Sequence, residues 1–340
     1  MGSNLFRSNS GSALIPEICL QILGHAIDND PKSAASLSRL SKDFKYLLSK
    51  YERSLSKSIR DVNTRNFTHT NADQDEIWSS QIPPGDAVVP ILSYQWVDEM
   101  HSRRQTIEFL ITHEVSEMVD TTNSANWPTL DIPKEELLKR LVMFKKEALF
   151  LLYRLADCTA GLTETPEIRF KQSEFLDSLS SDELADLGVI VEVMGHGFFT
   201  MTKNALLESG LLNNMAPLPA NASHLYTPIS TPIEDLRTDH WIRECMCVFE
   251  DLVQKYGPAF AYAYIEGSND RMRRPDLWAR LQMQHGLDNM NAYEMGYTMS
   301  YASLQSVVWR VFCRRVECSL QDSWKIARER VEAQMQGYKV

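Results

Sequence analysis

His113 and Glu117 are the first side chains whose types and spacing suggest metal chemistry, in the stretch His113-Glu114-Val115-Ser116-Glu117. On a helix they would lie one turn apart, as do the ligands of zinc helices built on His-Glu-x-x-His. The second histidine of that motif is absent, and Val115 and Met118 suit a helix that packs on others. The pattern therefore favours a structural helix over a metal site.

The cysteines offer a second set of metal donors; they are Cys19, Cys158, Cys245, Cys247, Cys313 and Cys318. Cys245-x-Cys247 has His240 nearby, and Cys313 precedes Cys318 by five residues, so both groups hold donor types that zinc prefers. Two cysteines two apart on a helix point to opposite sides and cannot easily share one ion. We therefore expect buried, reduced thiols, with no metal and no cofactor.

Gly195-His196-Gly197 is the only glycine pair that invites comparison with a phosphate-binding loop. It has no strand before it and no third glycine, so a phosphate cradle is disfavoured. Two glycines in a helical stretch indicate a kink or a close helix crossing. His196 is then expected to be an interior, hydrogen-bonded residue. The chain also lacks Gly-x-Ser-x-Gly, a Walker loop and an aspartate-rich metal motif, and we predict that it is not an enzyme.

The 340 residues include 35 Lys and Arg against 45 Asp and Glu, a net charge of −10. Residues 1–60 carry nine basic and five acidic residues, net +4, which leaves −14 on residues 61–340. This balance argues against nucleic-acid binding, and the N-terminal lysines suit a solvated helix face. One basic cluster interrupts the acidic part, at Arg271, Arg273, Arg274 and Arg280. An anionic ligand would fit there, although pairing with the protein's own carboxylates is favoured.

These residues must be positioned by helices, because apolar residues recur at helical spacing along most of the chain. Ser180-x-x-Glu183, for example, has the form of a capping box that starts a helix. We predict an all-α fold, with a small N-terminal module and a larger irregular helical domain. The polar stretch 61–87 is the expected boundary, and residues 213–232, with four prolines and no charge, mark a possible subdivision.

Nothing in the sequence predicts export or membrane insertion. The first ten residues contain no hydrophobic run, and no segment approaches the ~18 uninterrupted apolar residues of a membrane span. We therefore expect a cytoplasmic or nuclear protein without a membrane partner.

The first predicted helix carries more apolar surface than packing on one side requires. Its polar line is thin and consists of Glu17, Gln21, Gly24 and Asp28. The rest of its circumference is covered by Ile15, Ile18, Cys19, Leu20, Ile22, Leu23, Ala26 and Ile27. A surface helix needs an apolar arc of only ~100° or somewhat more. The surplus predicts a second partner for this helix.

The same region resembles the F-box family. The family pattern is Leu-Pro-x-Glu-Ile-x-x-x-Ile-Leu, followed by an apolar helix with Ser-Lys/Arg-x-Phe. This chain has Leu14-Ile15-Pro16-Glu17-Ile18-Cys19-Leu20-Gln21-Ile22-Leu23 and then Leu37-Ser38-Arg39-Leu40-Ser41-Lys42-Asp43-Phe44, with Ile15 in place of the usual proline. The resemblance covers residues 12–60, after a flexible tail at 1–11 and before a helical body at 61–340.

An F-box is a small helical module that docks on the Skp-type adaptor of cullin–RING ubiquitin ligases. The resemblance thus implies a non-catalytic subunit that presents an unknown protein target to the ligase. The implied adaptor contacts are Leu14, Ile15, Pro16, Glu17, Ile18, Ile22, Leu23, Leu40 and Phe44. Two alternatives stay open: an all-α scaffold whose first helices complete its core, and a helical enzyme with an unread site.

Overall fold

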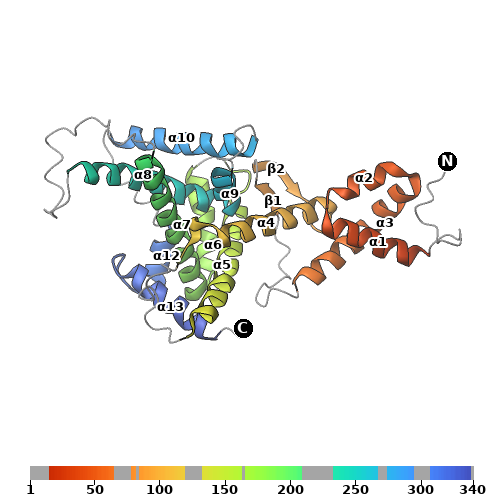
Figure 1. Ribbon diagram of the computed structural model, residues 1–340, viewed down its shortest axis with the longest axis horizontal. Coiled ribbons are helices and arrows are strands. Elements are labelled where there is room, and N and C mark those ends of the chain that lie inside the picture. The colour runs from red at the N-terminus through yellow and green to blue at the C-terminus, as the bar shows by residue number, and fades with distance from the viewer. Residues whose placement is uncertain are drawn as a thin grey trace. The chain divides into compact units, whose positions relative to one another are not determined.

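The computed structural model describes residues 15–64, 78–81, 84–118, 132–162, 165–208, 233–266, 274–294 and 307–337 (Figure 1). The chain divides into two compact units. Unit 1 comprises Met1–Ser80 and Pro84–Thr106, and unit 2 comprises Gln81–Pro83 and Ile107–Val340. Within the described ranges the elements are helices, apart from one small sheet of two strands. The prediction of an all-α fold is confirmed. The tail at 1–11 and the possible subdivision at 213–232 lie outside the described residues.

Unit 1 contains helices α1 to α3, the small sheet and most of a fourth helix. Its elements are α1 (Pro16–Asn29), α2 (Ser33–Leu40), α3 (Lys42–Thr64), β1 (Trp78–Gln81), β2 (Pro84–Val89) and the first turns of α4 (Tyr94–Thr112). They share one hydrophobic core, formed by Leu23, Ile27, Ala34, Phe44, Leu48, Leu55, Ile59, Val89, Trp96 and Val97.

The helix starts of unit 1 follow from local sequence. Pro16 occupies the first helical position of α1, where its missing N–H has no partner to lose. The backbone is extended at Ser41, between α2 and α3, and the Ser41 Oγ accepts a hydrogen bond of 3.1 Å from the Phe44 N–H. Ser41 is thus the N-cap of α3, which gives the Ser-Lys-x-Phe part of the family pattern a structural reason.

The compact unit that holds residues 12–60 is longer than the predicted module. Tyr94 ties the start of α4 to α3, since its hydroxyl donates to the Leu48 carbonyl oxygen (2.8 Å) and its N–H donates to Glu52 Oε1 (2.9 Å). The main division between the units falls after Thr106, and within the stretch 61–87 only Gln81–Pro83 are grouped with unit 2. That stretch also contains the end of α3, all of β1 and most of β2.

We expect a fragment of residues 1–106 to unfold in one cooperative transition, and a fragment of residues 1–60 to lose most of that stability. The shorter fragment lacks Val89, Trp96 and Val97, which complete the core of unit 1. Removing a single core tryptophan side chain costs ~3–5 kcal/mol. Thermal melts followed by circular dichroism will compare the two fragments. If the two fragments had the same melting temperature and the same cooperativity, α4 would not be needed for the module to fold.

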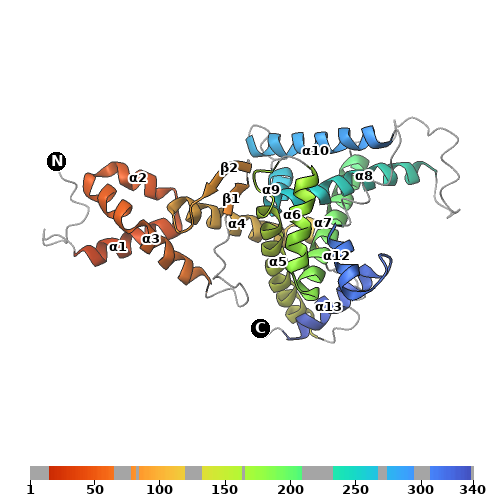
Figure 2. The same ribbon diagram turned by 180° about the vertical axis from the view of Figure 1, so that it is seen from behind.

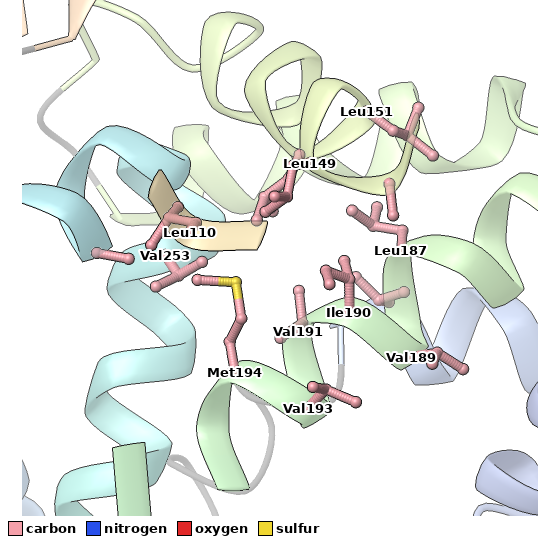
Figure 3. Close-up of a cluster of buried hydrophobic side chains, with 14 of the residues drawn as sticks. Leu110, Leu149, Leu151, Leu187, Val189, Ile190, Val191, Val193, Met194 and Val253 are labelled. Atoms are coloured by element: carbon pink, nitrogen blue, oxygen red, sulfur yellow. The ribbon is translucent and has the colours of Figure 1, made fainter. Parts of the chain in front are cut away.

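Unit 2 is built around one central helix, α7 (Ser181–Glu208) (Figures 1 and 2). The helices that contact it are α5 (Lys134–Asp157), α8 (Ile233–Tyr256), α12 (Val307–Val316) and α13 (Ser323–Gly337), together with the 3₁₀ turn η2 (Glu114–Ser116). The remaining helices are α6 (Thr165–Ser178), α9 (Pro258–Glu266) and α10 (Arg274–Glu294). Figure 3 shows Met194 of α7 pointing towards Leu110 and Val253 inside this core.

The start of α7 confirms the predicted capping box. The Glu183 N–H donates to Ser180 Oγ (3.2 Å), and the Ser180 N–H donates to Glu183 Oε2 (2.8 Å). In the described part of the chain, Ser181–Ala205 is the one segment whose length and composition would let it cross a membrane. Most of that segment is buried inside unit 2, as expected of a helix that is packed on all sides.

At three glycines of α7, atoms of other segments lie so close to the helix backbone that no side chain would fit. A methyl group at Gly188 would overlap the Trp309 ring, one at Gly195 would overlap the Glu250 carboxyl, and one at Gly197 would overlap the Val115 backbone. The prediction that Gly195 and Gly197 mark a close crossing is confirmed. The phosphate-loop alternative has no support, since both residues lie inside the helix.

Candidate protein-docking surface

The first helix exposes a row of isoleucines, which we name the isoleucine face of α1: Ile15, Ile18 and Ile22. Their side chains are 57%, 40% and 48% exposed. Ile18 and Ile22 are four residues apart and lie on one side of α1, and Ile15 is the extended N-cap residue that precedes the helix. Three large β-branched side chains in a row on a small unit are the kind of surface that a partner covers.

A neighbouring side of α1 holds the helix in place. Cys19, Leu23 and Ile27 recur every four residues and are buried, with exposed fractions of 3%, 1% and 0%. Leu23 and Ile27 belong to the core of unit 1. The apolar surplus recognised in the sequence therefore divides into one face for folding and one face left open to solvent.

The implied adaptor contacts fall on both sides of this division. Ile15, Ile18, Ile22, Leu40 and Glu17 are exposed and accessible to a partner. Leu23 and Phe44 are 1% and 3% exposed. Both lie in the core of unit 1 and stabilise its fold, and an adaptor contact by either side chain stays a prediction. Leu14 and the side chain of Pro16 lie outside the described part.

A row of cations runs along the exposed side of α3; we name Lys42, Lys45, Lys50, Arg53 and Lys57 the basic stripe. All five side chains are exposed. Among the described residues none of them forms an ion pair with a carboxylate. Lys50 Nζ lies 5.3 Å from the centroid of the Tyr46 ring, which is also exposed. The stripe gives the exposed side of α3 a positive charge.

The stretch from His113 to Glu117 forms a short 3₁₀ turn and not an α-helix. α4 ends at Thr112, and η2 follows at Glu114–Ser116. His113 caps η2, because its Nδ1 accepts a hydrogen bond of 3.1 Å from the Val115 N–H, and its ring stacks on Phe109. The expectation that His113 and Glu117 lie one turn apart on a helix was therefore wrong. His113 thus has a structural role in this turn, and the absence of a metal here remains a prediction.

Next to this turn is a buried serine–lysine pair that the sequence analysis missed. Lys145 Nζ donates to Ser116 Oγ and to the Ile111 carbonyl oxygen, both at 3.1 Å. Burial lowers the pKa of Lys145 to about 8, and nearby Glu117 opposes this shift. The signal was present as a lysine in the leucine row of α5, four residues from Leu141 and Leu149.

A serine next to a lysine of lowered pKa is a nucleophile–base combination, but its setting here is structural. Ser116 is fully buried, and its hydroxyl donates to the Leu110 carbonyl oxygen. The Lys145 ammonium binds a carbonyl at the C-terminal end of α4, where a cation is favoured by the helix dipole. The pair thus fixes the turn between α4 and η2.

A second buried ionisable group, also missed, joins α7 to α13. Asp186 is 7% exposed, and its Oδ1 accepts a hydrogen bond of 3.0 Å from Gln334 Nε2. Burial raises the pKa of Asp186 to about 8, with the Gln334 bond acting against the shift. The carboxylates of Glu147, Asp182 and Glu183 raise it further. This group is therefore protonated at neutral pH.

The other candidate sites are dispersed. Across the described residues, no group of three or more His, Cys, Asp or Glu side chains is placed to hold a metal ion. Cys245 is buried and Cys247 is half-buried, while the side chain of His240 is outside the described part. The absence of a metal and of a cofactor remains a prediction.

His196 and Arg280 were also singled out in the sequence, and the structure shows the surroundings of both. His196 is exposed, with Nε2 at 3.8 Å from Glu192 Oε1, so the interior role expected for it was wrong. In the basic cluster, Arg280 Nε pairs with Asp276 Oδ1 at 2.7 Å, as expected of pairing within the protein. The side chains of Arg271, Arg273 and Arg274 lie outside the described part.

Comparisons with models of protein families, with characterised proteins and with solved structures found no match to this chain. The isoleucine face, the basic stripe and the Ser41 cap are thus the observations on which a function must be argued.

Proposed function

We propose that the protein is a substrate-recruiting subunit of a Skp–cullin–F-box type ubiquitin ligase. Unit 1 binds the Skp-type adaptor through the isoleucine face of α1, and unit 2 binds a protein target. The observation that carries the proposal is the two-sided apolar pattern of α1, with one side in the core and the other exposed. Residues 14–44 that resemble the F-box lie within this same unit.

The proposed role is mechanical and needs no catalytic group in this chain. Fully burying an isoleucine contributes ~1.5–3 kcal/mol, and the side chains of the isoleucine face are only half exposed before binding. Each therefore contributes ~1 kcal/mol on association, before the costs of ordering. The target is then held near the ligase for transfer of ubiquitin by other subunits, in the cytoplasm or the nucleus.

Replacing Ile18 and Ile22 together by serine is expected to weaken capture of the adaptor by ~30-fold, from ~2 kcal/mol of lost burial. The melting temperature should change little, because neither residue belongs to the core of unit 1. Binding to a purified Skp-type adaptor by calorimetry and thermal melts by circular dichroism are the two measurements. The matched control is Leu277→Ser with Leu281→Ser, two comparably exposed leucines on α10 in unit 2.

The outcomes separate the proposal from its main alternative. Lost capture with an intact melt in the Ile18/Ile22 variant, and normal capture in the α10 control, support the ligase role. No capture by the parent protein, despite an intact unit 1, would favour an all-α scaffold that uses the isoleucine face for another partner. Unchanged capture in the Ile18/Ile22 variant would exclude this face as the adaptor site.

A further inference from the structure

The end of α12 has the geometry of a Schellman motif. The Cys318 N–H donates to the Cys313 carbonyl oxygen at 3.1 Å, which is the bond from sixth to first residue that defines this cap. Between them Glu317 has a φ of 56°, the left-handed conformation that the motif places one residue before its end. A glycine usually occupies that position.

The motif brings together the side chains of its first and sixth residues, which are usually apolar. Here both are cysteines. The cap places the side chains of Cys313 and Cys318 on the same side of the turn, and Cys313 Sγ is 3.6 Å from the Ser319 carbonyl oxygen. Both are free thiols and both are half-buried. The backbone therefore already holds two thiols side by side, which is what a disulfide requires.

We propose that Cys313 and Cys318 form a reversible intramolecular disulfide by exchange with oxidised glutathione. In the first step the thiolate of Cys318 attacks one sulfur of glutathione disulfide and releases one glutathione. In the second step Cys313 attacks the mixed disulfide at Cys318 and releases the second glutathione. The two cysteines lose two electrons and two protons, and one glutathione disulfide becomes two glutathione thiols.

The order of the two steps follows from the surroundings of Cys313. Burial raises the pKa of the Cys313 thiol to about 11, and Cys318 contributes to the shift. A thiol that keeps its proton is a poor nucleophile towards a dissolved disulfide. As the second thiol it attacks a sulfur that the cap holds beside it, so proximity compensates for its small thiolate fraction.

The disulfide would fix the turn that anchors α12. Arg315, in the last turn of α12, donates to the carbonyl oxygens of Leu179 (3.0 Å) and Asp177 (2.7 Å) at the end of α6. Arg314 pairs with the Asp177 carboxylate. Closing the cap covalently holds these two arginines and the left-handed Glu317 in place. Oxidation is therefore expected to stabilise the contact between α6 and α12, whether or not the adaptor binds.

The test uses the full-length protein and a series of glutathione redox buffers, followed by alkylation and digestion with trypsin. Trypsin cuts after Arg314 and Arg315, so Cys313 and Cys318 end on different peptides unless a disulfide joins them. We expect a linked pair of peptides, 311–314 with 316–325, in oxidising buffer and its loss after reduction. We also expect the melting temperature to rise by several degrees in the oxidised parent protein.

Two variants complete the design. Cys313→Ser should trap glutathione on Cys318 and abolish the linked peptides, whereas Cys247→Ser should leave them unchanged. Stable glutathione on Cys318 of the parent protein, with Cys313 still open to alkylation, would overturn the proposal. Linkage of either cysteine to another position would also overturn it. The parent digest decides the result alone if a variant fails to fold.

Discussion

Gly197→Ala is expected to lower the free energy of unfolding of unit 2 by ~3 kcal/mol or more. The added methyl group would overlap the Val115 backbone, and overpacking of this kind costs ~1–3 kcal/mol where neighbours can move. Here the neighbour cannot easily move, because Ser116 and Lys145 fix the same turn through hydrogen bonds. Chemical denaturation followed by circular dichroism measures the loss. In a unit of this size it corresponds to a fall in Tm of ~6–12 °C.

Gly24→Ala is the matched control within the same chain. Gly24 lies inside α1, where an added methyl group would be 3.6 Å from Leu55 Cδ2, an ordinary contact. Alanine is favoured over glycine inside a helix, so this change should stabilise unit 1 by ~0.5–1 kcal/mol. If Gly197→Ala were equally harmless, the close crossing of α7 with η2 would be refuted.

Asp186→Asn is expected to stabilise unit 2 at neutral pH, by ~3 kcal/mol or more, and to change its pH dependence. The pKa of Asp186 is raised to about 8 by burial, whereas an unfolded aspartate has a pKa of ~4. Between these values the folded state binds one more proton than the unfolded state. The free energy of unfolding therefore falls by ~1.4 kcal/mol for each pH unit as the pH rises through this window.

Asparagine removes this slope and retains an oxygen that accepts the Gln334 hydrogen bond. Denaturation curves at pH 5, 6, 7 and 8 for parent and variant give the difference directly. Glu174→Gln is the control: its carboxylate is half exposed and paired with Lys171 at 2.8 Å, so its loss should cost less than ~1 kcal/mol. Parallel curves for parent and Asp186→Asn would show that this carboxyl is ionised in the folded protein.

Features that depend on neighbouring residues along the chain were predictable from the sequence. The capping box at Ser180 and Glu183 is one, because both partners lie within a single turn. The glycines of α7 are another, since glycine inside an apolar helix usually marks close packing. The apolar surplus of α1 likewise predicted an exposed row, but pattern alone could not separate Ile22, which is exposed, from Leu23, which is buried.

Features that depend on distant residues were not predictable. Trp96 of α4 packs in the core of unit 1. The sequence of α4 shows one continuous amphipathic pattern, which did not indicate that its first turns belong to this core. Lys145 and Asp186 find their partners in other helices, so a charge in an apolar row was visible but its role was not. His196 was expected inside because glycines flank it. The crossing at Gly195 and Gly197 instead leaves His196, which lies between them, on the exposed side of α7.

The central position of α7 has a consequence for the order of synthesis. Asp182 of α7 pairs with Arg330, which lies 148 residues later in the chain. In the neighbouring helix α5, Arg140 donates to the carbonyl oxygen of Met335, 195 residues later. The residues of unit 1 end at Thr106, so we expect this unit to fold while the ribosome is still working. α7 must wait for about 130 further residues, on the order of 10 s at typical elongation rates. During that time its apolar sides are exposed on the nascent chain, where chaperones that bind hydrophobic segments will meet it first.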